Sequence, residues 1–160
     1  PYQGVLYAGL MLIEKGTKVL EYNARFGDPE TQPVLMRLKT DIIDIIEVIL
    51  AGKLDQIKIE WYDQAAVCVV IAAGGYPGSY RKGDLISGID DAEAAGATVF
   101  HAGTKFKEGA FVSAGGRVLG VTAMAESIAD AITKAYAAVD KISFADCFNR
   151  SDIGAKAINR

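Results

Sequence analysis

The chain opens with two apolar segments separated by a short polar turn. Residues 5–13 are rich in β-branched and large apolar side chains, and residues 18–23 resume an extended pattern. Between them, residues 14–17 read Glu-Lys-Gly-Thr, a composition typical of a tight turn. We therefore expect a β-hairpin, followed over residues 24–30 by a loop rich in Gly, Asp and Pro.

Two helical patterns follow the loop. Thr31 can cap a short helix that tolerates Pro33 in its first turn. Thr40 or Asp41 can cap a second helix that ends at Gly52. In this second helix the spacing i, i+3, i+4, i+7, i+8 predicts one buried apolar face, formed by Ile42, Ile45, Ile46, Ile49 and Leu50.

Beyond residue 60 the pattern changes to short strands. Residues 65–73 are continuously apolar, which predicts a strand covered on both faces. Further strand candidates, separated by glycine-rich turns, are residues 84–89, 97–102, 110–114 and 117–123. We expect the last two to form a hairpin across Gly115 and Gly116, because glycine adopts positive φ without steric cost.

A closing helix is predicted after the last strand. Ser127 and Asp130 form a capping box. One apolar stripe of this helix consists of Ile128, Ala131, Ile132, Ala135 and Val139. The fold class is therefore α+β, with a hairpin and helices in residues 1–60 and a small β-rich domain with its closing helix in residues 61–160.

Composition narrows the classes of function. The 17 basic and 20 acidic residues give a formal net charge of −3 without a run of Lys or Arg, so no nucleic-acid partner is expected. The longest apolar stretch is about half the length that a membrane-spanning helix requires, and no charged leader opens the chain, so we expect a cytoplasmic protein without a membrane partner. Cys68, Cys147 and His101 have no partners at zinc-ligand spacing.

Candidate chemistry begins at Glu21 and Asn23. Side chains two apart in a strand project to the same face, so a carboxylate and a carboxamide oxygen would lie side by side. Magnesium takes one or two such ligands together with water and substrate phosphates, and this pair suffices for a magnesium nucleotide. A Glu-x-Asn tripeptide also recurs by chance at solvated strand ends. The loop that follows is therefore needed to distinguish a metal site from an ordinary strand end.

That loop resembles the signature of a known enzyme family. Residues 25–32 read Arg-Phe-Gly-Asp-Pro-Glu-Thr-Gln and closely match glycinamide ribonucleotide synthetases, and the Glu-x-Asn pair is similar to the metal strand of the ATP-grasp superfamily. The likeness extends to residues 5–10, 74–78, 99–105 and 115–119. The chain thus resembles the C-terminal portion of such a synthetase, with the end of an ATP-grasp domain followed by the C-terminal domain.

The resemblance implies a reaction and its cofactors. These enzymes join glycine to 5-phosphoribosylamine in de novo purine biosynthesis, through a glycyl phosphate, and release glycinamide ribonucleotide, ADP and phosphate. ATP is the co-substrate and Mg²⁺ or Mn²⁺ the metal, with Glu21 and Asn23 as its implied ligands. Residues 5–13 lack the further carboxylate that several superfamily members carry, so a second protein-held metal is not implied.

Other polar residues are candidates for substrate contacts. Arg25 is the cation nearest the metal strand, and we expect it to contact the transferring phosphate or a carboxylate as a catalytic group. Asp28 and Glu30 could receive a substrate ammonium, although Asp28 could equally serve only to order the turn. Arg117, with backbone donors of Gly115 and Gly116, could bind the ribose phosphate, or the segment could be an ordinary turn.

The resemblance also implies upstream domains that this chain lacks. Its first residues, which contain no initiator methionine, read as the start of an excised segment, and we expect the chain alone to be inactive. Two alternatives stay open: another ATP-grasp carboxylate-amine ligase, and a non-catalytic assembly module formed by residues 61–160. His101 is expected to be a hydrogen-bonded structural histidine.

Overall fold

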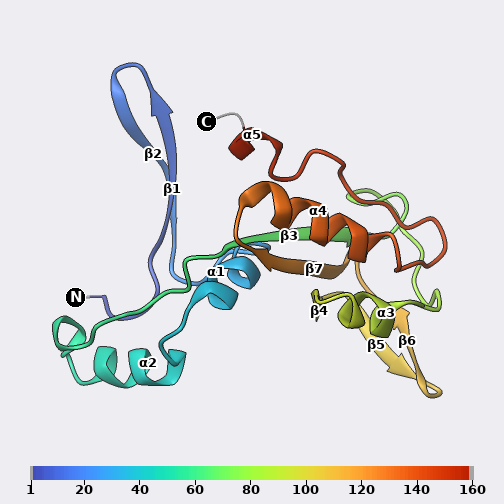
Figure 1. Cartoon of the computed structure of the whole chain (residues 1–160), viewed down its shortest axis with the longest axis horizontal. Coiled ribbons are helices and arrows are strands. Elements are labelled where there is room, and N and C mark those ends of the chain that lie inside the picture. The colour runs from blue at the N-terminus through green and yellow to red at the C-terminus, as the bar shows by residue number, and fades with distance from the viewer. Residues whose placement is uncertain (1, 159–160) are drawn as a thin grey trace. The chain divides into compact units, whose positions relative to one another are not determined.

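The computed structural model describes residues 2–158, and the chain divides into two compact units, Pro1–Tyr62 and Asp63–Arg160. Figure 1 shows the elements of each unit. Helices and antiparallel sheets occur together, so the predicted α+β class is confirmed. No helix within residues 2–158 is long and apolar enough to cross a membrane.

The first unit begins with the predicted hairpin, which is confirmed. Strands β1 (Tyr7–Ile13) and β2 (Gly16–Asn23) pair antiparallel around a two-residue turn. Gly16 has φ of +107°, a conformation that glycine adopts without strain. The pairing shifts by one residue between Gly9 and Leu10, where a β-bulge leaves an extra residue on β2.

Two helices and a short 3₁₀ turn complete the first unit: α1 (Thr31–Arg37), α2 (Ile42–Leu50) and η1 (Leu54–Gln56). Asp41 caps α2 as predicted, with its carboxylate accepting a 2.8 Å hydrogen bond from the Ile43 amide. The prediction that Thr31 caps α1 is wrong by one residue. Glu30 occupies the cap position, and the Thr31 hydroxyl instead donates to the carbonyl of Gly27.

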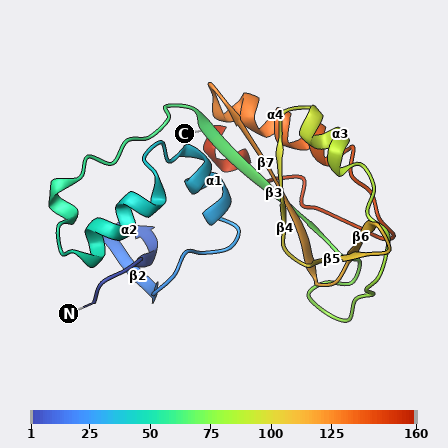
Figure 2. The same cartoon turned by 90° about the horizontal axis from the view of Figure 1, so that it is seen from below.

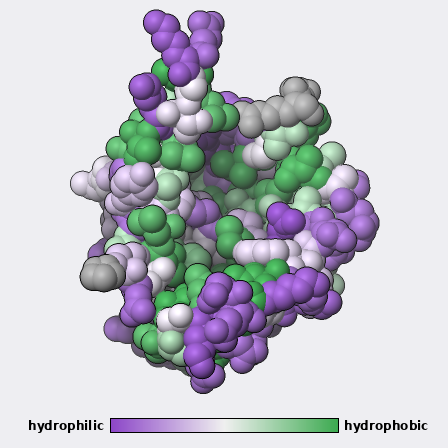
Figure 3. Space-filling model, turned by 90° about the vertical axis from the view of Figure 1, so that its left-hand side faces the viewer, coloured by the Kyte–Doolittle hydropathy of each residue, from purple (hydrophilic) through white to green (hydrophobic). Residues whose placement is uncertain are grey.

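The predicted buried face of α2 is confirmed only in part, with Ile42 and Ile49 half-buried. Ile45 is buried, whereas Ile46 and Leu50 remain 44% and 73% exposed. Exposed apolar side chains also occur along both hairpin strands, and Figure 3 shows hydrophobic patches on the surface that it displays. The apolar residues of α2 have the spacing of one helix face, yet part of this face stays exposed, because the first unit has too few elements to cover it.

The second unit is built on a three-stranded antiparallel sheet. Its order is β3–β7–β4, with β3 spanning Ala65–Ala72, β7 spanning Arg117–Ala125 and β4 spanning Thr98–His101. Helix α4 (Ile128–Val139) packs on β3 and β7, as Figures 1 and 2 show. The shared core is apolar and includes Val69, Ile71, Leu119 and Val121, all at most 1% exposed.

Helix α4 follows the sequence prediction closely. The Ser127 hydroxyl oxygen accepts a 3.1 Å hydrogen bond from the Asp130 amide, and the same hydroxyl donates to the Asp130 carboxylate at 2.6 Å. The Ser127 half of the predicted capping box, the N-cap bond to the Asp130 amide, is therefore confirmed. The buried face of the helix is formed by small and branched residues, namely Ala131, Ala135, Ala138 and Val139.

The predicted hairpin across Gly115 and Gly116 is wrong. Strand β6 (Ala110–Ser113) pairs with β5 (Thr104–Lys107) in a separate two-stranded sheet, whereas β7 pairs with β3 and β4. Neither glycine has positive φ. Gly115 instead lies backbone to backbone against Gly103, where a Cβ on Gly103 would come within 2.6 Å of the Gly115 Cα.

Residues 84–89 do not form the predicted strand. Only isolated bridges occur there, Leu85 with Val112 and Ser87 with Ser143, and helix α3 (Ile89–Ala94) begins directly afterwards. Sequence reasoning also missed β5, α3 and the short α5 (Ala155–Ile158). These elements are four to six residues long, too short to show a helical or strand period.

Candidate functional site

The end of β2 brings Glu21 and Asn23 together. The Asn23 side-chain amide donates a 3.1 Å hydrogen bond to the Glu21 carboxylate, which places both side chains on one face of the hairpin. Glu21 is exposed and Asn23 half-buried. A hard cation could therefore reach both side chains from solvent.

The opposite strand completes this face. Tyr7 pairs with Asn23, and Gly9 pairs with Glu21. Directly opposed residues of an antiparallel pair project to the same side of the sheet, so Tyr7 joins the two polar side chains. A Cβ on Gly9 would come within 3.2 Å of the Glu21 Cγ, and the absence of a side chain there leaves room for the Glu21 stem.

The loop after β2 folds around Gly27. This residue is buried, and the position that its Cβ would occupy lies 2.0 Å from a carboxylate oxygen of Glu30. The Thr31 amide donates a 3.1 Å hydrogen bond to the Gly27 carbonyl, which starts α1. The Glu30 carboxylate thus occupies the space that a side chain at residue 27 would need, and a larger residue there would displace it.

Tyr7 links the hairpin to this loop. Hydrogen bonding with the Glu30 side chain and the Glu30 charge raise the pKa of Tyr7 above its ordinary value of 10.0. Partial burial and the Glu21 charge act in the same direction, whereas Arg25 opposes them. The pKa of Tyr7 therefore depends on two carboxylates and one guanidinium of the same unit.

Arg25 and Asp28 both have local partners. The exposed Arg25 guanidinium donates a 3.1 Å hydrogen bond to the neighbouring carbonyl of Phe26. Asp28 accepts a 3.1 Å hydrogen bond from the Gln32 amide, one turn along the chain. This contact supports the turn-ordering interpretation of Asp28, and the predicted substrate contacts of both residues stay predictions.

The donor set determines what kind of metal site is possible. Within residues 2–158 no group of three or more His, Cys, Asp or Glu side chains could hold a metal by itself. Glu21 and Asn23 therefore fit a magnesium ion that takes its other ligands from phosphates and water, and they do not fit a closed protein cage. Such an ion would replace their hydrogen bond, because the amide must turn its oxygen toward the cation.

Arg117, Gly115 and Gly116 lie in the second unit. The Gly115 amide donates to the Gly103 carbonyl at 3.1 Å, so that donor is already used, which argues against its predicted role in phosphate binding. Gly116 lies under the Tyr76 ring, with a Cβ position 2.2 Å from the nearest ring carbon. Arg117 is exposed at the start of β7, and its phosphate contact stays a prediction.

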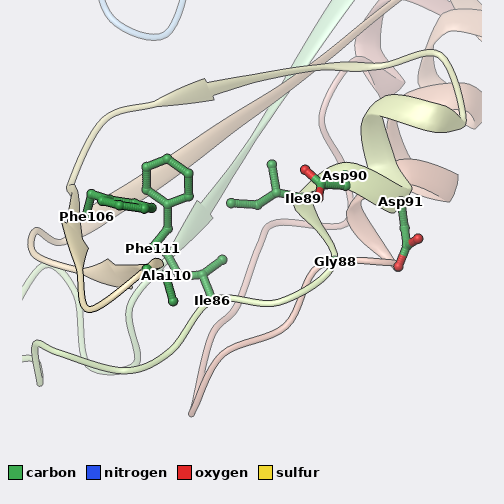
Figure 4. Close-up of a pocket in the computed structure, with 9 residues that line it drawn as sticks. Ile86, Gly88, Ile89, Asp90, Asp91, Phe106, Ala110 and Phe111 are labelled. Carbon is green, nitrogen blue, oxygen red and sulfur yellow. The ribbon is translucent and has the colours of Figure 1, made fainter.

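His101 has structural contacts in the second unit. Its Nδ1 lies 3.0 Å from the Thr104 hydroxyl, and its ring lies 4.2 Å from the Phe111 ring, centroid to centroid. Phe111 also lines a pocket of about 370 Å³ between β6 and the start of α3 (Figure 4). In Figure 4 the Ile89 side chain extends toward the Phe111 ring. None of the predicted site residues lines this pocket.

Sequence comparison identifies the family. The family described as phosphoribosylglycinamide synthetase, C domain, matches residues 66–156, and phosphoribosylglycinamide synthetase, ATP-grasp (A) domain, matches residues 1–31. The chain belongs to the phosphoribosylglycinamide synthetase family. The predicted resemblance is therefore confirmed for both parts of the chain, and an ATP-grasp ligase family implies use of ATP and a divalent metal.

Individual members of the synthetase family match almost the whole chain. The phosphoribosylamine–glycine ligase of Caldanaerobacter subterraneus is 54% identical over 96% of this chain, and that of Synechocystis sp. is 54% identical over 98%. The crystal structure of phosphoribosylamine–glycine ligase from Thermotoga maritima covers 92% of the chain with a TM-score of 0.81 and 34% identity. The chain spans only 36–38% of the length of these proteins.

Sequence reasoning did not place Tyr7 and Gly9 on the same hairpin face as Glu21 and Asn23. The signal that could have found them is the register of the hairpin, because residues opposite Glu21 and Asn23 must share their face. A regular hairpin without the bulge would place Ala8 opposite Glu21 and Leu6 opposite Asn23. The bulge moves Tyr7 and Gly9 into these places.

Proposed function

We propose that this chain is part of an ATP-dependent ligase that joins glycine to 5-phosphoribosylamine, and that Glu21 and Asn23 hold the magnesium ion of its nucleotide. The name of these relatives, phosphoribosylamine–glycine ligase, supports the reaction. The single structural observation that carries the site is the 3.1 Å contact between Glu21 and Asn23 on one exposed hairpin face. Manganese could replace magnesium, because the same oxygen donors suit both ions.

The proposed chemistry is phosphoryl transfer followed by acyl transfer. A glycine carboxylate oxygen attacks the γ-phosphorus of ATP, ADP leaves, and glycyl phosphate forms. The amine of 5-phosphoribosylamine then attacks the glycyl carbonyl, phosphate leaves, and glycinamide ribonucleotide results. Both steps require positioning and charge stabilisation rather than a protein nucleophile.

The chain's own residues have distinct roles in this proposal. Arg25, exposed beside the metal strand, stabilises negative charge on the transferring phosphate. Glu30, and less directly Asp28, offers a carboxylate to a substrate ammonium. Arg117 of the second unit binds the phosphate of the ribose. The magnesium ion supplies neutralisation of phosphate charge when it is bound.

The chain alone is expected to lack this activity. It spans about a third of its relatives, and the first unit leaves the apolar face of α2 and both hairpin strands exposed. We propose that the upstream part of the ATP-grasp domain covers these surfaces. The same part would complete the nucleotide pocket and exclude water from it. The purified 160-residue chain should therefore release no ADP with glycine and phosphoribosylamine.

The test of the metal site uses the full-length enzyme. Glu21→Gln and Asn23→Ala should each reduce glycine-dependent ADP release at least about 100-fold, because an electrostatic contact to the transferring group is lost. They should also raise the magnesium concentration needed for half-maximal rate. Glu14→Gln, at the exposed hairpin tip, is the matched control and should change neither quantity.

Two results would contradict the proposal. Normal magnesium-dependent turnover in both site variants would make the hairpin a structural support, consistent with an assembly module. ADP release driven by another carboxylate in place of glycine would assign the chain to a different carboxylate-amine ligase.

A further inference from the structure

We propose that Tyr76 is a positioning residue for the ribose-phosphate contact of Arg117: its ring packs on Gly116 and fixes the backbone from which the guanidinium extends. This inference rests on the proposed function and deepens it, because it adds a residue that determines specificity for the phosphate-bearing amine. Tyr76 lies in the loop after β3, whereas Arg117 is the first residue of β7.

A β-bulge sets the direction of Arg117. Leu119 pairs with Ile71 of β3, and both belong to the core. The next pair joins Arg117 to Ala72, so Val118 is an extra residue on β7. In a regular strand Arg117 would face the same side as Leu119, toward the core. With the bulge, Val118 and Leu119 are both at most 1% exposed, and Arg117 is exposed.

Backbone hydrogen bonds hold the segment around Arg117. The Gly116 carbonyl accepts a 2.8 Å hydrogen bond from the Ala73 amide. The Arg117 carbonyl accepts a 2.9 Å hydrogen bond from the Gly103 amide, and the Gly115 amide donates to the Gly103 carbonyl. The chain that carries the guanidinium is therefore tied to the segments that follow β3 and β4.

The Tyr76 ring packs directly on this segment. A Cβ on Gly116 would lie 2.2 Å and 2.7 Å from two carbons of the Tyr76 ring, and 3.1 Å from a carbon of the Tyr80 ring. The two tyrosine rings meet edge to face, with 6.2 Å between their centroids. Gly116 is buried and Tyr76 is half-buried, so an aromatic pair covers the residue directly before Arg117.

Two consecutive glycines before a binding residue require such a restraint. Glycine has more backbone freedom than any other residue, so Gly115 and Gly116 alone would allow the following side chain to change direction. A guanidinium binds phosphate through two parallel hydrogen bonds and must keep its orientation to do so. The ring of Tyr76 restrains the backbone, and the missing side chain of Gly116 leaves room for that ring.

The experiment measures glycine-dependent ADP release by variants of the full-length enzyme at varied phosphoribosylamine concentration. Tyr76→Leu keeps an apolar side chain without the flat ring, and it should raise the KM for phosphoribosylamine on the order of 10-fold. The KM values for glycine and magnesium-ATP should change less than about 2-fold, since their proposed contacts belong to the first unit. Tyr76→Phe keeps the ring and should behave as the wild type.

Gly116→Ala tests the same contact from the other side. Its Cβ would displace the Tyr76 ring, so this variant should reproduce the Tyr76→Leu defect with the tyrosine intact, and it decides the question if Tyr76→Leu does not fold. Phe106→Leu is the matched control. Phe106 meets the Phe111 ring edge to face at 5.1 Å in the same unit but does not pack on Gly116, so its kinetics should not change.

A double-variant cycle separates positioning from general stabilisation. Arg117→Ala should raise the KM for phosphoribosylamine at least about 30-fold. Adding Tyr76→Leu should then cause little further loss, since both changes remove the same contact. Ribose 5-phosphate should also inhibit Tyr76→Leu about 10-fold more weakly than the wild type, whereas a smaller amount of folded enzyme would lower only the apparent kcat.

An unchanged KM for phosphoribosylamine in folded Tyr76→Leu would overturn the positioning role, as would full additivity of Tyr76→Leu with Arg117→Ala. Failure of the proposed function has a different signature. The wild-type enzyme would then release no ADP with glycine and phosphoribosylamine, whichever residue occupies position 76.

Discussion

Glycine has two separate uses in this chain, turns and close packing. Gly16 needs positive φ, whereas Gly103 and Gly116 allow close packing, because backbone atoms or an aromatic ring occupy the position of their Cβ. Composition alone does not distinguish the two uses. The hairpin expected across Gly115 and Gly116 was wrong for this reason, since these residues allow neighbouring segments to approach rather than reverse the chain.

Gly103→Ala tests the close-packing use. The new Cβ would lie 2.5 Å from the Arg117 carbonyl oxygen and 2.6 Å from the Gly115 Cα, both backbone atoms that cannot rotate away. The free energy of unfolding should fall by about 1–3 kcal/mol, as expected for overpacking. Chemical denaturation measures the loss. Gly78→Ala, whose Cβ would meet its nearest atom at 3.2 Å, is the control and should lose much less.

The pKa of Glu60 is expected to lie below its ordinary value. Lys58 Nζ lies 3.0 Å and Lys39 Nζ 3.4 Å from its carboxylate oxygens, and hydrogen bonds from Lys58 and then Lys39 lower the pKa of Glu60 from its ordinary 4.5. The stabilisation is therefore present above the unfolded pKa and is lost as pH falls through the folded pKa. It should be small and sensitive to salt, since the groups are exposed.

A carbon-detected NMR titration of the Glu60 carboxyl checks this expectation. The midpoint should lie below 4.5 in the wild type and rise in Lys58→Ala, the variant that removes the larger effect. Lys53→Ala should leave the midpoint in place. A wild-type midpoint at or above 4.5 would show that these ion pairs do not persist in solution.

At the same scale, the site was only partly predictable from the sequence. Glu21 and Asn23 share a face because strands have a period of two, and this follows from the sequence alone. Tyr7 could not be placed, because a one-residue bulge changes which side chains face the ligands and leaves no compositional sign. The effect of Glu30 on the pKa of Tyr7 joins the loop to β1, so no local sequence pattern contains it.

Among the elements, the predictions succeeded where the signal was long and locally capped. The hairpin, β3 and α4 each have a clear period or a turn at the expected place. The short β5, α3 and α5 were missed. Helix α2 was found with its Asp41 cap, yet its apolar face is only partly covered, because periodicity predicts an apolar stripe but not the element that covers it.

The Ser127 cap of α4 contributes to the free energy of unfolding, and Ser127→Ala should remove this contribution. The Asp130 amide loses its 3.1 Å acceptor, and the free energy of unfolding should fall by about 1 kcal/mol. Thermal or urea denaturation of the chain measures the change. Ser151→Ala, in an exposed bend after the sheet, should be neutral. Equal stabilities of the two variants would mean that water replaces the cap without loss.

At the scale of the whole chain, the two units differ in how much apolar surface they bury. Ile45 is the one buried hydrophobic side chain among described residues 2–62, whereas the second unit has a continuous core around β3, β7 and α4. This contrast agrees with a chain that spans about a third of its relatives. Its second unit contains a closed hydrophobic core, and its first unit presents surfaces suited to further chain.

Hydrogen exchange of the 160-residue chain should show this difference directly. Amides of β3 and β7 should exchange at least about 100-fold more slowly than those of β1 and β2, because opening the core costs more than opening an uncovered hairpin. Mass spectrometry of peptic fragments measures both sets in one sample. Comparable protection of the hairpin would mean that its exposed apolar side chains are covered in solution, for example by self-association.

The strand order of the second unit has a consequence for its synthesis on the ribosome. Within the three-stranded sheet, β3 pairs only with β7, which is translated after α3, β4, β5 and β6. The most apolar strand must therefore leave the exit tunnel and wait for its partner, on the order of several seconds at about 5–20 residues per second. During that interval β3 is an apolar strand with unpaired edges. A ribosome-associated chaperone that binds exposed apolar segments should therefore bind β3 more than the other strands.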